Sequence, residues 1–296
     1  MDWSDLRYFL AVARGERLNI AARALGVDQA TVGRRLTRLE ESFGAPLFER
    51  GPKGYALTDA GLRLMPAAEQ MERAALAAAD AADAQVEALT GAVRIGAPVG
   101  AATYLLAEGA VALSRRHPGL ELQVVALPLR HSLSKREADM AITVTPPQDG
   151  RLLRRKLADY KLRIYATRQY LDSIAPIETP ADLTRAAWIA YIPDLIMDRE
   201  LDILPLINPD IQPRLTSANI HVQLRFVLAH GGLCVMHDFI AREHPELVCL
   251  FPEELSFTRS YWLVTHADYR RSRRVREVAE WVATHLPREI AGPAAR

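Results

Sequence analysis

The sequence has few cysteines, no long apolar run and almost no net charge. Two cysteines in 296 residues exclude a disulfide framework and favour a reducing compartment. No stretch approaches the about 18 uninterrupted apolar residues of a membrane span, and the first residues carry acids where a signal peptide has an apolar core. We therefore expect a cytoplasmic protein with no membrane partner.

The near-zero net charge hides an uneven distribution. The chain has 37 basic and 36 acidic residues, a net charge of +1, which taken alone argues against nucleic-acid binding. Residues 1–58 hold nine basic and seven acidic residues, whereas residues 59–90 hold two basic and six acidic ones. The acidic segment masks a short basic stretch from Arg34 to Lys53. The charge thus excludes only a broad, non-specific coating of DNA.

Motifs of catalysis and metal binding are also missing. The chain has no G-x-S-x-G, H-E-x-x-H or H-R-D motif, and the segment GAPVGA (96–101) lacks the spacing of nucleotide-binding loops. One set of residues has the spacing C-x2-H-x6-H-x4-C, which matches no common zinc module; it comprises Cys234, His237, His244 and Cys249. We expect a buried, inert Cys234, no metal or other cofactor, and no enzymatic activity. A small-molecule enzyme and a solute-binding module are the alternatives, and the missing signal peptide disfavours the second.

What is present falls into three parts. A length of 296 residues predicts roughly two domains of ~150 residues. The composition changes near residue 90, where an Ala-rich stretch gives way to short β-branched runs alternating with helical stretches. We predict a helical head (1–58), a long linker helix (59–90) and an α/β body (91–296).

The head has the pattern of a helix-turn-helix. The first helix carries apolar residues at positions 6, 9, 10 and 13; the second covers 20–25, with Asn19 as N-cap and Gly26 as its stop. Asp28 caps a third helix, whose apolar stripe comprises Val32, Leu36, Leu39 and Phe43. The turn between the last two helices is about three residues long, as in helix-turn-helix proteins. Two β-prone runs around Gly-Pro-Lys-Gly (51–54) predict a hairpin, the wing.

The outer face of the third helix is suited to DNA. Gln29 can bond adenine edges, and three arginines with no acid among them can bond guanine or phosphate: Arg34, Arg35 and Arg38. Arg50 and Lys53 of the wing can reach backbone phosphates. The alternative is that the arginines are only a solvated helix face.

The linker helix predicts a dimer strut. Thr58 is its expected N-cap, and Pro66 is expected to kink the helix or lie near its start. Seven of eight positions are apolar at heptad spacing from Met65 to Leu89, which favours a partner helix. A second heptad frame fits as well, and Ala-rich sequence also favours helix without a partner.

The body has the βαβ pattern of a parallel sheet with helical crossovers. Helices are expected at 101–116, from Thr179-Pro180, and at 273–286. The expected strands are 93–97, 120–127, 139–144, 162–166, 188–191, 215–216, 233–236 and 260–265. The basic segment 269–277 either opens the last helix, with Val275, Val278, Ala279 and Val282 facing the sheet, or contacts DNA.

Residues 6–61 resemble the winged helix-turn-helix of LysR-type transcriptional regulators. The shared motifs are N-x-A-A-x-x-L-x-V, Q-x-x-V-x-R-x-[IL]-x-x-L-E, G-x-x-L-F-x-R and L-T-x-A-G, beginning at residues 19, 29, 44 and 57. The segments 133–145, 161–171 and 261–282 are similar to the effector domain of the family, so the resemblance covers essentially the whole chain. It departs at Gly33, where the family usually has serine, which removes a phosphate contact and lowers helix propensity by ~1 kcal/mol relative to alanine.

The resemblance implies a function and a set of sites. It implies a winged helix-turn-helix joined by a linker helix to a periplasmic-binding-protein-like effector domain, with lobe I at 91–161 and 266–296 and lobe II at 162–265. Gln29 and Arg34 match DNA-contacting positions, and Thr31, Arg35, Arg50 and Lys53 match them less closely. The implied partners are a double-stranded DNA operator, a small-molecule effector, RNA polymerase and further copies of the chain, as a dimer of dimers.

The effector is expected in a cleft between the lobes, where amides at the helix start after GAPVGA face it. Arg130 is the expected partner for an anionic group, with a surface-loop arginine as the alternative. His237 replaces a proline of the family and is expected to add a titratable group. The full set of expected effector-binding residues is Val99, Gly100, Ala101, Thr103, Arg130, His131, Thr143, Thr145, Tyr191, Ser217, Asn219 and His237.

Overall fold

The computed structural model describes residues 2–51, 54–82, 89–126, 138–146, 152–196, 198–266 and 272–292. The chain divides into two compact units, Met1–Gln85 and Val86–Arg296. Each unit has its own hydrophobic core. Within the described ranges, no helix is long and apolar enough to cross a membrane.

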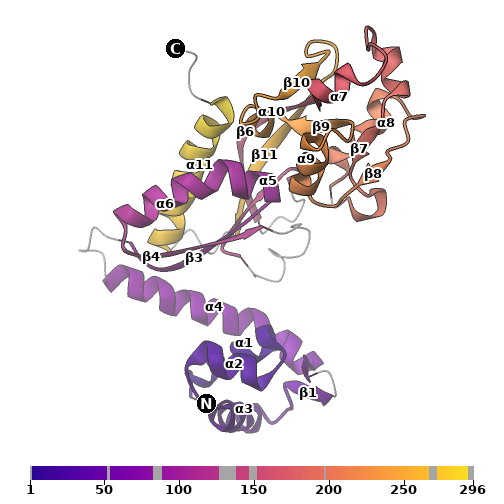
Figure 1. Ribbon diagram of the computed structural model, residues 1–296. Helices are drawn as coiled ribbons and strands as arrows, with labels where there is room; N and C mark the ends of the chain where they lie inside the picture. Colours follow the sequence, from indigo (N-terminus) through magenta and orange to yellow (C-terminus); the bar gives the residue numbers. More distant parts are fainter. Residues whose placement is uncertain are drawn as a thin grey trace. The chain divides into compact units, whose positions relative to one another are not determined.

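Three helices form the head: α1 (Asp5–Gly15), α2 (Leu18–Leu25) and α3 (Gln29–Phe43) (Figure 1). Helix α2 begins earlier than predicted, so Asn19 lies in its first turn and Arg17 takes the N-cap position. The predicted stop at Gly26 (φ 68°) and the predicted cap at Asp28 are confirmed, since the Asp28 carboxylate accepts the Thr31 amide at 2.7 Å.

The apolar stripe of α3 packs against α1 and α2. Val32, Leu36 and Leu39 are at most 1% exposed and belong to the core of the head, together with Phe9 and Leu10. The predicted fourth member of the stripe is wrong, because Phe43 is 42% exposed. It is the last residue before Gly44 (φ 65°), which ends the helix there.

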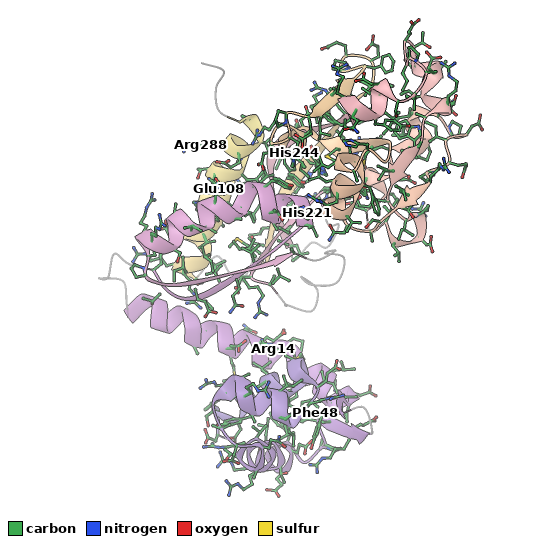
Figure 2. All side chains as sticks on the ribbon, viewed as in Figure 1. Arg14, Phe48, Glu108, His221, His244 and Arg288 are labelled. Atoms are coloured by element: carbon green, nitrogen blue, oxygen red, sulfur yellow. The ribbon has the colours of Figure 1, made fainter. Side chains whose placement is uncertain are left out.

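The wing is the antiparallel pair β1 (Phe48–Gly51) and β2 (Gly54–Leu57), as predicted. Phe48, labelled in Figure 2, packs its ring 5.3 Å from that of Phe9. The Tyr55 amide donates to the Glu16 carbonyl at 2.8 Å. Gly54 has φ 127°, and a Cβ there would lie 2.2 Å from the same carbonyl, so glycine allows the wing to seat against the end of α1.

Helix α4 (Asp59–Ala82) follows the wing. Thr58 is its N-cap as predicted, because its hydroxyl accepts the Gly61 amide at 3.1 Å. Pro66 lies inside the helix. Arg14 of α1 pairs with Glu72 of α4 at 2.7 Å, which ties this helix to the head. Much of the proposed heptad seam lies outside the residues whose side chains are described.

The body contains one nine-stranded sheet in the order β4-β3-β5-β11-β6-β9-β7-β8, with β10 also on β6. Strands β3, β4 and β5 are parallel, as are β9, β7 and β8, but β11 runs antiparallel to both β5 and β6. The predicted parallel pairing is therefore confirmed within each of these two groups of three strands, and the long strands β6 and β11 depart from it. The bounds are β3 (Thr90–Ala97), β4 (Gly119–Ala126), β5 (Met140–Thr143), β6 (Leu152–Thr167), β7 (Trp188–Ala190), β8 (Leu215–Thr216), β9 (Leu233–His237), β10 (Leu247–Leu250) and β11 (Ser256–His266).

Helices pack against both halves of this sheet. In the first half of the body, α5 (Val99–Ala101), the π-turn η1 (Ala102–Leu106) and α6 (Ala107–Arg116) follow β3, and α11 (Arg273–Ala291) packs against η1 and β3. Val275, Val278 and Val282 of α11 are buried, as predicted. The second half contains α7 (Arg168–Asp172), η2 (Pro180–Arg185), η3 (Pro193–Leu195), η4 (Arg199–Leu201), α8 (Leu204–Ile207), α9 (Ile220–Leu228) and α10 (Asp238–Ala241).

Two lobes share the long strands β6 and β11, which run through both. We call the part with β3–β5, α5–α6 and α11 the first lobe, and the part with β7–β10 and α7–α10 the second lobe (Figure 1). Residues 262–265, which the sequence assigned to lobe II, pair with β5 of the first lobe. Strand β6 begins ten residues before its predicted start at Leu162. The early start was not predicted because no residue in the first half of the strand is buried, so no apolar strand pattern marks it.

Candidate functional site

A groove lies between α3 and the wing. Its volume is about 500 Å³, and it is lined by Leu18, Gly33, Arg34, Leu36, Thr37, Arg38, Glu41, Arg50 and Tyr55. A neighbouring hollow that shares Leu18 and Tyr55 contains Gln29, Arg17 and Asn19. The structure therefore brings Gln29, Arg34 and Arg50 to one surface of the head. Thr37, Arg17 and Tyr55 belong to the same surface and were not predicted. Helix spacing from Arg34 could have indicated Thr37, whereas Arg17 and Tyr55 come from other elements of the head and carry no such local signal.

Arg34 is held at the start of α3 by a chain of hydrogen bonds. Its guanidinium donates to the Thr31 hydroxyl at 3.2 Å, and that hydroxyl donates to the Asp28 carboxylate at 2.9 Å. Hydrogen bonds from the Thr31 amide and from its hydroxyl lower the pKa of Asp28. The predicted site residue Thr31 thus already serves the cap, while the exposed end of Arg34 faces solvent. The Arg50 guanidinium lies 5.7 Å from the centre of the Tyr55 ring, a cation–π distance.

Arg35 and Arg38 have a different environment from Arg34. Both pair with Asp5, which is 1% exposed, at 3.0 Å and 2.7 Å. Asp2 accepts from both as well, at 3.1 Å and 2.9 Å. The hydrogen bond that each guanidinium donates to the Asp5 carboxylate is the main cause that raises the pKa of each arginine.

These ion pairs show that Arg35 and Arg38 are more than a solvated helix face. The two arginines join α3 to the start of α1, which fixes the angle at which α3 is presented. A direct contact of either arginine with DNA stays a prediction. Lys53, the remaining predicted DNA contact, lies outside the described residues.

Side-chain hydrogen bonds join the two lobes of the body, and two of them involve predicted effector residues. Thr103 of η1 lies 3.0 Å from Nε2 of His221 at the start of α9, where Figure 2 labels the histidine. The Tyr104 ring stacks on His221 with centroids 5.6 Å apart. At a second place, the Thr145 hydroxyl, after β5 of the first lobe, donates to the Asp198 carboxylate of the second lobe at 2.9 Å. Two predicted effector residues, Thr103 and Thr145, thus lie where the lobes meet.

The start of α5 packs against the second lobe. Gly100 is buried, and a Cβ there would lie 3.4 Å from Ile240 and 3.8 Å from Ile220. Val99 is half-buried and Ala101 is fully buried beside it. Opposite them, the predicted residues Ser217 and Asn219 shape the start of α9: Asn219 caps it by accepting the His221 amide at 2.8 Å, and the Asn219 amide donates to Ser217 at 3.1 Å.

A small cavity of about 30 Å³ lies in the second lobe. Its lining is Leu162, Ile189, Ala190, Tyr191, Ile196, Leu201, Asp202, Ile203, Leu204, Gln223, Val235 and His237, so it brings together the predicted residues Tyr191 and His237. His237 is 5% exposed, and burial lowers its pKa to about 3. The prediction that His237 adds a group titrating near neutrality is therefore wrong, because burial disfavours the charged imidazole.

Tyr160, a residue that sequence reasoning missed, stacks on His237 with ring centroids 5.3 Å apart. It was missed because the first half of β6 was not predicted as a strand. Arg130 and His131 lie outside the described residues. Thr143, at the end of β5, has a buried hydroxyl with no hydrogen-bond partner among the described residues.

The cysteines occupy separate environments. Cys234 is fully buried in β9, as predicted, and burial raises the pKa of its thiol to about 12. Cys249 is half-buried in β10. Over the described parts of the chain, no group of three or more histidine, cysteine, aspartate or glutamate side chains is arranged to hold a metal ion.

Comparisons with known proteins agree with this architecture. A family model described as "LysR substrate binding domain" matches residues 87–287. A second model, "Bacterial regulatory helix-turn-helix protein, lysR family", matches residues 3–62. These two matches correspond to the body and to the head with the start of α4.

Curated relatives match along the whole chain. The chain is 29% identical over 299 residues to the HTH-type transcriptional regulator PtxR of Pseudomonas aeruginosa, covering 98% of this chain and 94% of that protein. It is 28% identical over 295 residues to the Mau operon transcriptional activator of Paracoccus denitrificans, covering 99% and 100%.

Solved structures share the fold. A full-length OxyR variant from Pseudomonas aeruginosa has a TM-score of 0.73 at 19% identity, with 100% of this chain and 99% of that chain covered. CrgA, a LysR-type transcriptional regulator from Neisseria meningitidis, has a TM-score of 0.61 at 22% identity, with 97% and 100% covered. Since one family model alone matches more than half of the chain, the chain belongs to the LysR family of transcriptional regulators, DNA-binding proteins with an effector-binding domain.

Proposed function

We propose that the head reads a pseudo-palindromic operator through α3 and the wing, and that a small molecule bound between the two lobes of the body controls the outcome. The protein acts in the cytoplasm as a dimer of dimers, paired through α4, and is not an enzyme. The observation that carries the DNA part is the single exposed surface formed by Gln29, Arg34 and Arg50 around the groove of the head.

The geometry of this surface supports DNA reading. The N-terminal turn of α3 is exposed and is rigidly capped by Asp28, so Gln29 and Arg34 are presented from an ordered helix end. Arg50 lies on the same groove, where a wing contacts the backbone beside the major groove. The buried pairing of Asp5 with Arg35 and Arg38 holds α3 at a fixed angle without using Arg34.

The lobe contacts support control by a ligand. The hydrogen bonds Thr103–His221 and Thr145–Asp198 cross between the lobes at two places, so a ligand entering there changes how the lobes meet. Effector binding would then alter the equilibrium between lobe arrangements in proportion to its differential affinity for them.

The test replaces Arg34 with alanine in the full-length protein. We expect operator binding, measured by fluorescence anisotropy, to weaken about 5- to 150-fold for each bound head, because each head loses one base or phosphate contact of ~1–3 kcal/mol. The salt dependence of binding should also become shallower if the contact is to phosphate.

The matched control is Arg63→Ala, which removes an exposed arginine of α4 that does not line the groove. Both variants lower the net charge by one, so a general electrostatic effect would weaken both equally. Unchanged binding by Arg34→Ala, or equal weakening by both variants, would contradict the proposed reading surface.

A further inference from the structure

Two buried polar atoms beside the cavity of the second lobe have no partner. Nδ1 of His237 and the hydroxyl of Tyr160 make no hydrogen bond with any described residue, although the two side chains are 5% and 2% exposed. The Tyr261 ring stacks on Tyr160 with centroids 4.2 Å apart, which buries Tyr160 from that side. Buried polar atoms in native proteins are normally paired, with protein, water or ligand. These two atoms therefore mark a place for a hydrogen-bonding guest.

The guest would lie among mostly apolar groups. Most of the cavity lining is aliphatic, and its polar members are Tyr191, Gln223, His237 and Asp202. Tyr160 does not itself line the cavity, but its ring stacks on that of the lining residue His237 with centroids 5.3 Å apart. A cavity of about 30 Å³ admits a group the size of an amide or a hydroxyl rather than a whole metabolite.

The charges near the cavity disfavour an anion. Among the described lining residues, Asp202 is the one charged side chain, and it is negative. Arg259, whose charge also acts on Tyr160, already pairs with the Glu200 carboxylate at 3.0 Å. His237 supplies no positive charge at neutral pH, because burial lowers its pKa to about 3. A carboxylate or phosphate entering here would lose its hydration without gaining a cation from the described lining residues.

We propose that this cavity, lined by His237 with Tyr160 stacked on it, binds an uncharged hydrogen-bonding group of the effector, such as an amide, alcohol, phenol or lactone. The rest of the effector lies between the lobes, so the inference rests on the proposed effector site. The neutral imidazole and the phenol would each bond the guest, and together they select uncharged ligands over carboxylates of the same shape.

The test compares amides with their isosteric carboxylates by thermal shift of the full-length protein. The probes are the pairs benzamide and benzoate, phenylacetamide and phenylacetate, and nicotinamide and nicotinate. We expect at least one amide to raise the Tm in a concentration-dependent manner while its carboxylate does not, because binding to the native state alone raises apparent stability.

Two tyrosine variants from the same strand test the site itself. Tyr160→Phe removes only the unpartnered hydroxyl, so we expect about 2- to 10-fold weaker amide binding with an unchanged or higher Tm for the free protein. Tyr165→Phe is the control: its hydroxyl donates to Asp238 at 2.9 Å and does not line the cavity, so this change should lower the Tm and leave amide binding unaltered.

The outcomes separate this inference from the proposed function. A response to carboxylates equal to or greater than that to amides would keep an effector site but overturn its uncharged character. Amide binding that is insensitive to Tyr160→Phe, or no response to any amide, would overturn the assignment of the cavity. Operator binding, measured in parallel, would show whether the regulator function stands in each case.

Discussion

Replacing Gly33 with alanine probes the position of α3 at which this chain has glycine where the LysR resemblance leads us to expect serine. Gly33 lies in the middle of α3 and lines the groove beside Arg34. A Cβ built there meets no atom within 4 Å, and its backbone does not have a positive φ. Alanine therefore fits without strain, and the helix gains its full propensity advantage over glycine.

The expected gain is about 1 kcal/mol, the difference between glycine and alanine in a helix interior. For a unit the size of the head with α4, this gain corresponds to a rise in Tm of roughly 4–8 °C. Gly33→Ser should gain less stability than alanine, but it restores a hydroxyl on the groove. One added hydrogen bond to a phosphate is worth ~0.5–1.5 kcal/mol, so we expect operator affinity about 2- to 10-fold higher than that of the alanine variant.

The assays are urea denaturation of the full-length protein, followed by circular dichroism, and operator binding by anisotropy. Gly61→Ala is the control, because a Cβ there would lie 2.2 Å from the Leu47 carbonyl and should destabilise the head. The reasoning is refuted if Gly33→Ala lowers the free energy of unfolding. Loss of operator binding by a stabilised Gly33→Ala variant would show instead that the bare backbone must approach DNA closely.

Two further predictions concern buried polar groups. Asp5→Asn keeps the size of the side chain but removes the charge that holds Arg35 and Arg38; we expect a lower Tm and several-fold weaker operator binding although Asp5 is buried, and an unchanged Tm would contradict a structural role. His237 titrates at about pH 3 in the native protein and near 6.5 when unfolded, so the unfolded chain binds the extra proton between these values. Stability should therefore fall as the pH drops below about 6.5, by up to about 1.4 kcal/mol per pH unit, and His237→Phe should flatten this part of a calorimetric pH profile.

Much of the head could be predicted from sequence because its signals are local. The stripe Val32–Leu36–Leu39, the stop at Gly26 and the caps at Asp28 and Thr58 each depend on residues within a few positions of one another. The errors in the head are also local: the start of α2 and the exposed end of the stripe at Phe43. Helix ends are where neighbouring turns compete most closely.

The body was harder to predict because its central strands are set by distant partners. The first half of β6, with its run Arg154–Lys156, has no strand-like apolar pattern, and it becomes a strand because β11 pairs with it from about a hundred residues away. That pairing also makes the middle of the sheet antiparallel. The same missed segment contains Tyr160, so its unpartnered hydroxyl beside His237 could not be predicted from local sequence.

The sequence by itself determined the family, the presence of a winged head and the face of α3 that carries Gln29 and Arg34, because motif spacing and helix periodicity are written in consecutive residues. Only the tertiary structure decided the ion pairing and the protonation of individual side chains. It paired Arg35 and Arg38 with the buried Asp5, and by burying His237 it kept that imidazole neutral near pH 7. The physical reason is that charge pairing and desolvation depend on which surfaces meet in space, and those surfaces come from segments far apart in the chain.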